Sequence, residues 1–312
     1  PLIKGINFDE KCLVPEYSQH YDTITYWVTD TMFSYQIDTL AMTLTYMETD
    51  TTGTLVQRTD TLEMASKLTR EKQRKEQLKQ IEEWNKDREK KAKKAIIDIG
   101  QRMYVRNFVA ANDGNISVRT GENEVWATPT GVSKGFMKKK MLVKVDLEGN
   151  VLEGTYKPSS ELKMHLRAYK ENPNLRSVCH AHPPICTCFA IAGIPLDTPV
   201  LAEAIITLGD VPIAPYAELG SKEVPEVIAP YCHTHNGVLL ANHGVVTWAE
   251  DAYAAYYRLE SMEYYANILM LTEKVIGKQN TLTPEQVERL IAMREKFGIK
   301  QGGYPKVKEL NV

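Results

Sequence analysis

The feature that most constrains this 312-residue chain is a short apolar run with two histidines, Val178-Cys179-His180-Ala181-His182, which a proline pair ends. Residues i and i+2 of an extended strand point to the same face, so both imidazoles converge on one side of such a strand. Imidazole is the commonest side-chain metal ligand, and the pair therefore predicts a metal site. The alternative is that one histidine is a hydrogen-bonded core residue and the other is exposed.

Two further segments each contribute one ligand-type residue at the end of a short element. Glu161 follows a Lys-Pro-Ser-Ser sequence, and His243 precedes a glycine at a predicted turn. Together with His180 and His182 they offer three imidazole nitrogens and one carboxylate. Three imidazoles leave one position open for substrate, as in catalytic Zn²⁺ sites, and a carboxylate can fill that position at rest. Ligation by nitrogen and oxygen alone also suits Co²⁺, Mn²⁺ or Fe²⁺.

The remaining cysteine and histidines near these segments are assigned simpler roles. Cys179 faces the opposite side of the strand from His180 and is expected to be a small buried apolar residue. His165 follows Glu161 by one helical turn, where it can support the site, but core or surface packing is the favoured interpretation. His233 and His235 form a second pair at the same spacing, but they lie in a polar loop where a metal role is not favoured.

Three short segments offer groups typical of phosphate binding. Ser159-Ser160 precedes a predicted helix whose first-turn N–H groups lack partners and suit an anion. Gly114-Asn115 and Thr130-Gly131 lie in turns that supply backbone N–H, amide and hydroxyl donors. Together the segments predict a phosphorylated substrate whose other end reaches the metal.

The composition is ordinary for a soluble globular protein, with 43% apolar and 25% charged residues. A formal net charge of −2 favours neither nucleic acid nor an anionic membrane as a partner. No apolar run approaches the roughly 18 residues that span a bilayer, and no secretory signal is visible. The five cysteines do not form a secreted disulfide framework, so a reduced, cytoplasmic setting is expected.

The N-terminal third of the chain differs from the rest. Residues 1–60 are rich in Thr, Asp and Tyr, and their alternating patches predict two or three strands, as in a small β hairpin, within an extension of unassigned role. Residues 61–94 predict a charged helix whose Lys, Arg, Glu and Gln form a solvated face. From Ala95 the apolar spacing tightens, so this end is expected to dock on a core in the main domain, residues 95–312.

The main domain has short strands separated by turns and helices. Strands are expected near residues 116–119, 125–128, 141–145, 177–182, 211–216, 237–241 and 245–247. Helices are expected near residues 160–169, 184–191, 222–231, 249–275 and 284–297, the last capped by Thr283. Because there is no strict βαβ repeat, the pattern favours an α/β fold with a central mixed, largely antiparallel sheet flanked by helices.

Five sequence blocks occur in a fixed order and give a family resemblance. They are Asn112-Asp113-Gly114-Asn115-Ile116-Ser117-Val118-Arg119, Thr128-Pro129-Thr130-Gly131, Pro158-Ser159-Ser160-Glu161, His180-Ala181-His182 and Asn242-His243-Gly244. Their order and spacing resemble the class II aldolase/adducin family, and its L-fuculose-1-phosphate aldolase branch in particular. The resemblance covers about residues 90–300, while residues 1–60 lie outside it.

This resemblance implies a complete site. A divalent metal, usually Zn²⁺, would be held by His180, His182 and His243, and Glu161 would share the metal at rest and then act as a base. The phosphate would bind the residues of the three anion-type segments, Gly114, Asn115, Thr130, Gly131, Ser159 and Ser160. The family assembly, a cyclic homotetramer with active sites between subunits, would apply to this chain as well.

The implied reaction is reversible cleavage of a ketose 1-phosphate into dihydroxyacetone phosphate and an aldehyde. L-Fuculose 1-phosphate and a deoxypentulose 1-phosphate are examples of such a substrate. The cation would act as a Lewis acid that stabilises an enediolate. Glu161 would move the proton on the carbon next to the carbonyl, and a second group would protonate the aldehyde oxygen.

Two positions depart from the family pattern and bear on aldehyde specificity. Glu203 aligns with the family's tyrosine acid, and a carboxyl can serve there if burial raises its pKa. The alternative is a surface carboxylate at the start of a helix. Phe297 aligns with a family tyrosine that reaches into the neighbouring subunit's site.

Two other functions compete with aldol cleavage. The first keeps the fold and metal but is a sugar-phosphate dehydratase or epimerase, although the epimerase pattern has Asp where Glu161 stands. The second is a non-catalytic, adducin-like scaffold. Adducin-type domains lack the metal ligands, whereas all four ligand-type residues are present here.

Overall fold

A computed structural model describes the backbone of residues 13–17, 21–28, 31–38, 43–49, 55–61 and 67–305, and the side chains of residues 74–305. The chain divides into two compact units, Pro1–Glu82 and Glu83–Val312. Within the described residues, no helix has both the length and the apolar character needed to cross a bilayer.

The first unit contains a five-stranded antiparallel sheet in which each strand pairs with the next along the chain. Its strands are β1 (Leu13–Tyr17), β2 (Tyr21–Val28), β3 (Thr31–Asp38), β4 (Thr43–Thr49) and β5 (Leu55–Thr61). The sequence predicted only two or three strands here. The high content of Thr, Tyr and β-branched residues, which favour strands, extends across the whole region and supports the larger number.

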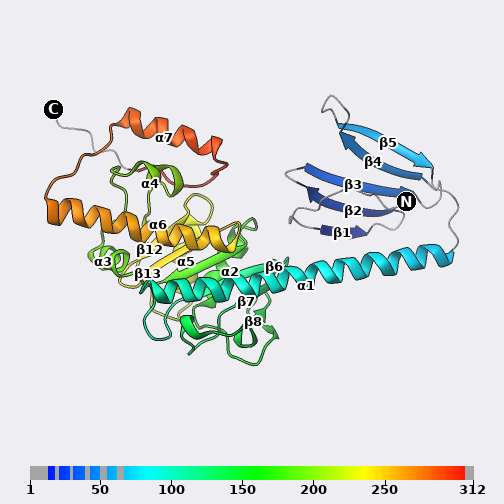
Figure 1. Cartoon of the computed structure of the whole chain (residues 1–312), viewed down its shortest axis with the longest axis horizontal. Helices are drawn as coiled ribbons and strands as arrows, with labels where there is room; N and C mark the ends of the chain where they lie inside the picture. The colour runs from blue at the N-terminus through cyan, green and yellow to red at the C-terminus, as the bar shows by residue number, and fades with distance from the viewer. Residues whose placement is uncertain are drawn as a thin grey trace. The chain divides into compact units, whose positions relative to one another are not determined.

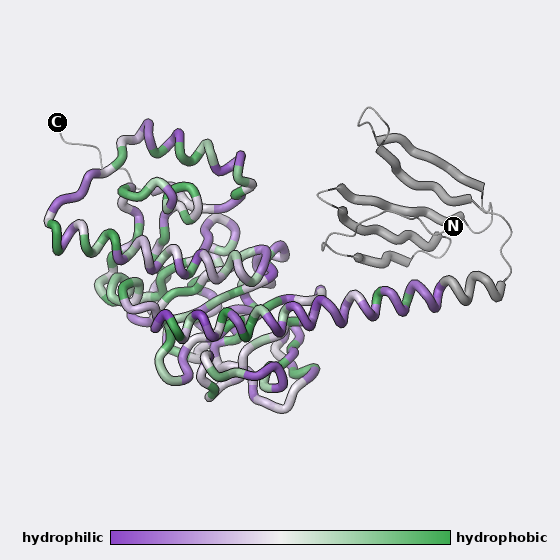
Figure 2. The backbone as a smooth tube through the Cα atoms, in the orientation of Figure 1, coloured by the Kyte–Doolittle hydropathy of each residue, from purple (hydrophilic) through white to green (hydrophobic). Residues whose placement is uncertain are grey.

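The long helix α1 (Lys67–Val105) leads into the second unit. Figure 2 shows that the part of α1 before the second unit's core is mostly hydrophilic. Ile96, Ile99 and Met103, nearer the end of the helix, are fully buried. Their spacing of three and four residues places these side chains on one helical face, as expected. Val105, at the end of the helix, is exposed.

The second unit is built on an eight-stranded sheet of order β11-β12-β13-β10-β6-β7-β8-β9. The strands are β6 (Asn115–Gly121), β7 (Glu124–Ala127), β8 (Val143–Val145), β9 (Val151–Glu153), β10 (Ser177–Ala181), β11 (Ile213–Ala214), β12 (Gly237–Leu240) and β13 (Gly244–Ala249). Only the β11–β12 pair is parallel in this sheet. The expected mixed, largely antiparallel sheet is therefore confirmed.

Helices cover both faces of this sheet (Figure 1). They are α2 (Leu162–Glu171), α3 (Pro184–Ala192), α4 (Ala202–Thr207), α5 (Glu223–Ile228), α6 (Ala252–Met270) and α7 (Pro284–Lys296). One buried cluster joins α1, α3 and α6 to one face, and a second joins α2 and α5 to the other. The fold class that the sequence predicted, an α/β sheet with flanking helices, is confirmed.

Helix ends follow the predicted signals. Helix α3 ends at Gly193, which has a left-handed φ of 69°. Helix α7 begins with a capping box in which the Thr283 hydroxyl accepts from the Gln286 N–H while the Gln286 side chain accepts from the Thr283 N–H. Helix α6 ends earlier than expected, at Met270, and a π-helical turn, η4 (Leu271–Ile276), continues it. Strand β9 and helix α4 are short elements that the sequence patterns did not predict.

Candidate metal centre

The sheet register places the histidine pair beside the first phosphate-type segment. On β10, His180 lies opposite Asn115 of β6 on one side and opposite Val246 of β13 on the other. Cys179 points to the other face, where it is fully buried in the apolar cluster, and burial raises the pKa of its thiol. The expected division of the strand into a ligand face and a core face is observed.

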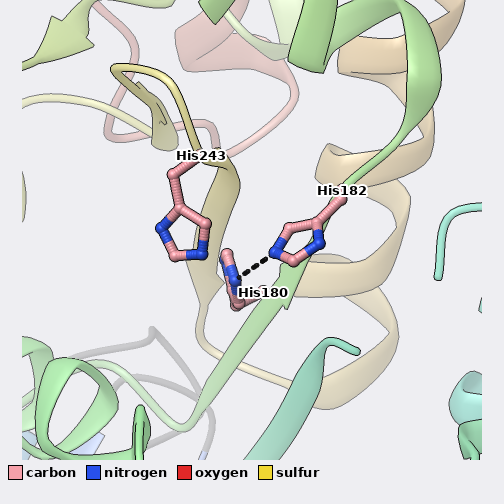
Figure 3. A group of neighbouring side chains, drawn as sticks. All are labelled: His180, His182 and His243. Atoms are coloured by element: carbon pink, nitrogen blue, oxygen red, sulfur yellow. Dashed lines mark hydrogen bonds between the residues drawn. The ribbon is translucent and has the colours of Figure 1, made fainter. Parts of the chain in front are cut away.

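Three histidine side chains point toward one another at this end of the sheet (Figure 3). His180 comes from β10 and His182 lies just after that strand, whereas His243 lies in the turn between β12 and β13. One ring nitrogen of each lies within 4.8 Å of the others. The Nε2 atoms of His180 and His182 are 3.1 Å apart. This is the one group of metal-ligating type found among the described residues.

Neighbouring groups fix which nitrogen of each histidine faces the centre. His180 Nδ1 lies 2.8 Å from the Val245 carbonyl oxygen, so Nδ1 carries the proton and Nε2 keeps its lone pair. His182 Nδ1 lies 3.4 Å from an Asp113 carboxylate oxygen, which assigns its proton in the same way. A second acceptor that orients each imidazole in this manner is typical of metal-binding histidines.

These observations fit a bound cation. Two nitrogen lone pairs that face each other at 3.1 Å repel unless a proton or a cation lies between them. A tetrahedral ion with metal–nitrogen bonds of about 2.0–2.1 Å sets its ligand atoms roughly 3.3 Å apart, close to the spacing found here. The residues present therefore suit a divalent metal of the zinc type.

Glu161 supplies the oxygen of the set from the opposite side. It is the N-cap residue of α2, and its Oε1 lies 3.1 Å from His243 Nε2 and 3.5 Å from His180 Nε2. Its other oxygen, Oε2, accepts a 2.8 Å hydrogen bond from the Asn115 amide. Oε1 is buried and accepts no hydrogen bond from the described residues, so it is free to bind a cation or a proton.

Burial sets the protonation of the centre. It lowers the pKa of His180 to about 3, because the imidazolium loses its hydration, and Glu161 offsets this only in part. Burial also lowers the pKa of His182. For Glu161, burial acts to raise the pKa, but the imidazoles of His180, His243 and His182 outweigh it and hold the pKa well below its usual value. Neutral imidazoles and an ionised carboxylate are the forms that bind metal.

Two residues allow His243 to reach the centre. Asn242 adopts a left-handed conformation with φ of 56°, which turns the chain sharply after β12. A Cβ on Gly244 would meet the Ala181 carbonyl oxygen and His182 Cδ2, both at 2.6 Å. Glycine is therefore required where β13 approaches the chain that carries His182.

The three phosphate-type segments are joined by backbone contacts. The Thr130 N–H donates to the Lys157 carbonyl at 3.0 Å, and the Ser159 N–H donates to the Thr128 carbonyl at 3.3 Å. The Thr128 hydroxyl in turn accepts from the Ile116 N–H of β6 at 3.2 Å. The segments around residues 115, 130 and 159 are thus held as one framework beside Glu161.

Within this framework the predicted phosphate residues differ in access. Thr130, Gly131 and Ser160 are exposed and Ser159 is half-buried, as an anion pocket requires. Asn115 is 2% exposed, and its amide contacts Glu161 rather than an open pocket. Its role as a phosphate ligand therefore stays a prediction, whereas its contact with the Glu161 carboxylate is observed.

Other predicted residues lie apart from the histidine centre. Glu203 is exposed on α4, and in the described residues it forms no ion pair with the three histidines. Phe297 is exposed at the C-cap of α7. His235 lies 3.5 Å from an Asp210 oxygen, and His233 is exposed. The acid role of Glu203 stays a prediction.

Two further groups lie around the centre, and the sequence patterns assigned a ligand role to neither. Asp113, which orients His182, was identified only as part of a turn, because a carboxylate in an Asn-Asp-Gly sequence is an ordinary turn residue. His165 is fully buried on α2, with Nδ1 2.8 Å from the Ser117 hydroxyl, and Tyr169 contacts the same hydroxyl at 2.8 Å. This network binds α2 to β6 directly behind Glu161.

Residues 94–270 match the model of the class II aldolase and adducin N-terminal domain. The match covers more than half of the chain, and we conclude that the protein belongs to the class II aldolase and adducin family. A solved structure of an L-fuculose 1-phosphate aldolase has the same fold, with a TM-score of 0.60 and 32% identity, covering 67% of this chain and 96% of that one.

Sequence relatives in this family carry out different reactions. An L-fuculose phosphate aldolase of Methanococcus maripaludis is 35% identical over 172 residues, 55% of this chain and 92% of the relative. A 5-deoxy-D-ribulose 1-phosphate aldolase of Bacillus thuringiensis is 31% identical over 210 residues, 67% of this chain and 97% of the relative. A 3-oxo-tetronate 4-phosphate decarboxylase of Haemophilus influenzae is 33% identical over 181 residues, 56% of this chain and 85% of the relative.

Two glycines of the framework provide a matched test of its packing. Gly114 and Gly131 both have left-handed φ values, 74° and 70°, so an alanine strains either position by about 1–2 kcal/mol. A Cβ on Gly114 would also meet Val109 Cγ1 at 2.6 Å and the His180 carbonyl oxygen at 2.9 Å, whereas Gly131 has open space. We expect Gly114→Ala to lower the free energy of unfolding by about 2 kcal/mol more than Gly131→Ala. Equal losses in denaturant unfolding would contradict this packing.

Buried His165 gives a prediction for pH. Burial lowers its pKa from 6.5 to about 3, so the unfolded chain binds more protons between these values and stability falls as the pH is lowered. Between pH 7 and pH 5 this one group should lower the free energy of unfolding by about 2 kcal/mol. Over the same range we expect the free energy of unfolding of His165→Gln to fall by about 2 kcal/mol less than that of the native chain. Denaturant unfolding in the presence of a chelator measures both. A pH dependence unchanged in the variant would show that His165 is not the group responsible.

Proposed function

We propose that this protein is a metal-dependent aldolase that cleaves a ketose 1-phosphate into dihydroxyacetone phosphate and an aldehyde. The observation that carries the proposal is the convergence of His180, His182, His243 and the free Oε1 atom of Glu161 beside the three phosphate-type segments. The aldolase relatives, for L-fuculose phosphate and for 5-deoxy-D-ribulose 1-phosphate, support a substrate of this class.

When bound to the three histidines, a divalent cation such as Zn²⁺, Mn²⁺ or Co²⁺ would supply Lewis-acid stabilisation of negative charge on a substrate oxygen. The protein's own contribution is to orient the imidazoles. The Val245 carbonyl and the Asp113 carboxylate hold His180 and His182 with their Nε2 lone pairs directed at the centre. Because these acceptors are fixed before substrate arrives, little reorganisation is needed during the reaction.

Glu161 is the proposed base. In the direction of cleavage, it returns a proton to the carbon next to the carbonyl after the carbon–carbon bond breaks. In the direction of synthesis, it removes that proton. Its free Oε1 atom is the oxygen available for the transfer, while the Asn115 amide holds Oε2 in place. The phosphate would lie against Thr130, Gly131, Ser159 and Ser160, with the Gly114-Asn115 turn behind it.

The group that exchanges a proton with the aldehyde oxygen is proposed to be Glu203 of a neighbouring subunit. Glu203 is exposed and forms no ion pair with the three histidines among the described residues, so in this proposal a neighbouring copy brings it to the centre. This assignment requires the homotetramer with sites between subunits that the family resemblance implies. Phe297, also exposed, would then border the same shared site.

A second candidate reaction is favoured by one specific comparison. The relative from Haemophilus influenzae is a 3-oxo-tetronate 4-phosphate decarboxylase. Loss of carbon dioxide from a four-carbon 3-oxo acid 4-phosphate leaves a three-carbon ketone phosphate, so this reaction breaks the same kind of bond beside a carbonyl. Both reactions place negative charge next to that carbonyl, and the same residues serve both.

The product mixture distinguishes the two reactions. We expect the protein, loaded with Zn²⁺, Mn²⁺ or Co²⁺, to release equal amounts of dihydroxyacetone phosphate and aldehyde from a ketose 1-phosphate such as L-fuculose 1-phosphate. If the protein releases carbon dioxide from 3-oxo-tetronate 4-phosphate and yields an aldehyde from no ketose 1-phosphate, the decarboxylase reaction is favoured instead. Loss of water without dihydroxyacetone phosphate would indicate a dehydratase, and a preparation without stoichiometric metal would favour a scaffold.

Two substitutions separate metal binding from proton transfer. His182→Ala removes one of three nitrogen ligands, so we expect metal content, measured by atomic emission, and turnover to fall together. Glu161→Gln keeps a side chain of the same shape without a basic oxygen, so metal content should stay within about twofold while kcat falls at least 100-fold. Retained turnover in Glu161→Gln would exclude this residue as the base.

A further inference from the structure

Lys134 is a buried cation in the loop that follows the Thr130-Gly131 turn. Its side chain is 2% exposed, although lysine is rarely buried without a partner. Its Nζ atom donates to the Asn112 carbonyl at 2.7 Å and to the Val132 carbonyl at 2.8 Å. These two acceptors belong to the 112–115 turn and to the 130–134 turn, which carry four of the predicted phosphate residues. One ammonium therefore joins two walls of the predicted pocket.

The backbone around Lys134 is packed against α1 with no space to spare. A Cβ on Gly100 of that helix would meet the Lys134 carbonyl oxygen at 2.8 Å, so a glycine is needed for the close approach. A Cβ on Gly135 would in turn lie 2.5 Å from the ring of Tyr104. The 134–136 turn, η1 (Lys134–Phe136), is thus packed closely on the helix, which fixes the backbone that carries the Lys134 side chain.

The charge of Lys134 has no paired carboxylate among the described residues. Asp113 and Glu161 act on it electrostatically, but neither comes within ion-pair distance. Burial lowers the pKa of Lys134 to about 8, so the amine is still mainly protonated at neutral pH. An ammonium has three N–H donors, and the two backbone carbonyls accept from only two of them. Among the described residues the third donor has no acceptor, so it and the positive charge remain for an anion.

We propose that Lys134 recognises the phosphate of the substrate, as the buried counter-charge of the pocket formed by the 112–115 and 130–134 turns. This inference rests on the proposed function only in taking a phosphorylated compound as the ligand. A buried ammonium attracts a phosphate more strongly than an exposed one, because solvent screens it less. The two carbonyl contacts keep the charge in place before the ligand arrives.

The experiment measures binding of inorganic phosphate to the full chain by calorimetry, so that it does not depend on turnover. Lys134→Gln removes the charge but keeps an amide donor for the carbonyls, and Lys134→Met removes both. Lys138→Gln, four residues along the same loop, removes an equal charge from an exposed position and serves as the matched control. Thermal unfolding and metal content are measured for every variant, with and without a chelator.

We expect phosphate affinity to fall at least tenfold in Lys134→Gln and Lys134→Met, and less than twofold in Lys138→Gln, with metal content unchanged in all three. In turnover, the Lys134 variants should raise KM for the phosphorylated substrate far more than they lower kcat. Native-like phosphate affinity in a folded Lys134→Gln variant would overturn the proposal, as would a native chain that binds no phosphate. If the native chain binds phosphate through Lys134 but cleaves no ketose phosphate, the reaction is wrong while this inference stands.

Discussion

The structure depends on the register of one strand. Strand β10 pairs with β6 on one side and β13 on the other, and this pairing puts His180 in line with Asn115 and Val246. A shift of one residue would turn His180 into the apolar cluster and Cys179 toward the centre. Apolar packing on the opposite face excludes that shift, because Cys179 and Ala181 are fully buried there. Apolar burial on one face of β10 therefore keeps the histidine ligands on the opposite face of the strand.

Helix α2 brings the second half of the site to this strand. It lies on the same sheet face, with Glu161 at its first turn and His165 one turn later in contact with Ser117. The Asn115 amide links the sheet directly to the carboxylate. These contacts hold the helix against the sheet, although Asn115 Oδ1 and His165 Nε2 are buried without a hydrogen-bond partner among the described residues. The Glu161 carboxylate is thus carried by a helix that these contacts hold against the sheet.

Much of this could be predicted from the sequence, because the strongest signals are local. The spacing of His180 and His182 fixes a shared strand face, Gly193 and Thr283 mark helix ends, and the missing βαβ repeat indicates a mixed sheet. What could not be predicted depends on contacts between distant segments. Asp113 resembles any turn aspartate until His182 is seen beside it, and Lys134 resembles any surface lysine until its burial is known. The five strands of the first unit exceeded the prediction, because Thr-rich alternation does not mark where one strand ends.

The close seat of the 134–136 turn on α1 extends the constraint on the site well beyond its ligands. Gly100 lies on a helix that carries none of the predicted ligands, yet its missing side chain sets where the Lys134 carbonyl can lie. A larger residue there would meet the Lys134 carbonyl oxygen and displace the turn, and with it one wall of the proposed anion pocket. Tolerance to substitution in this protein therefore does not follow distance from the histidines. Gly100 is a buried position on α1, remote from the histidines in sequence, and it nevertheless leaves no space for a side chain.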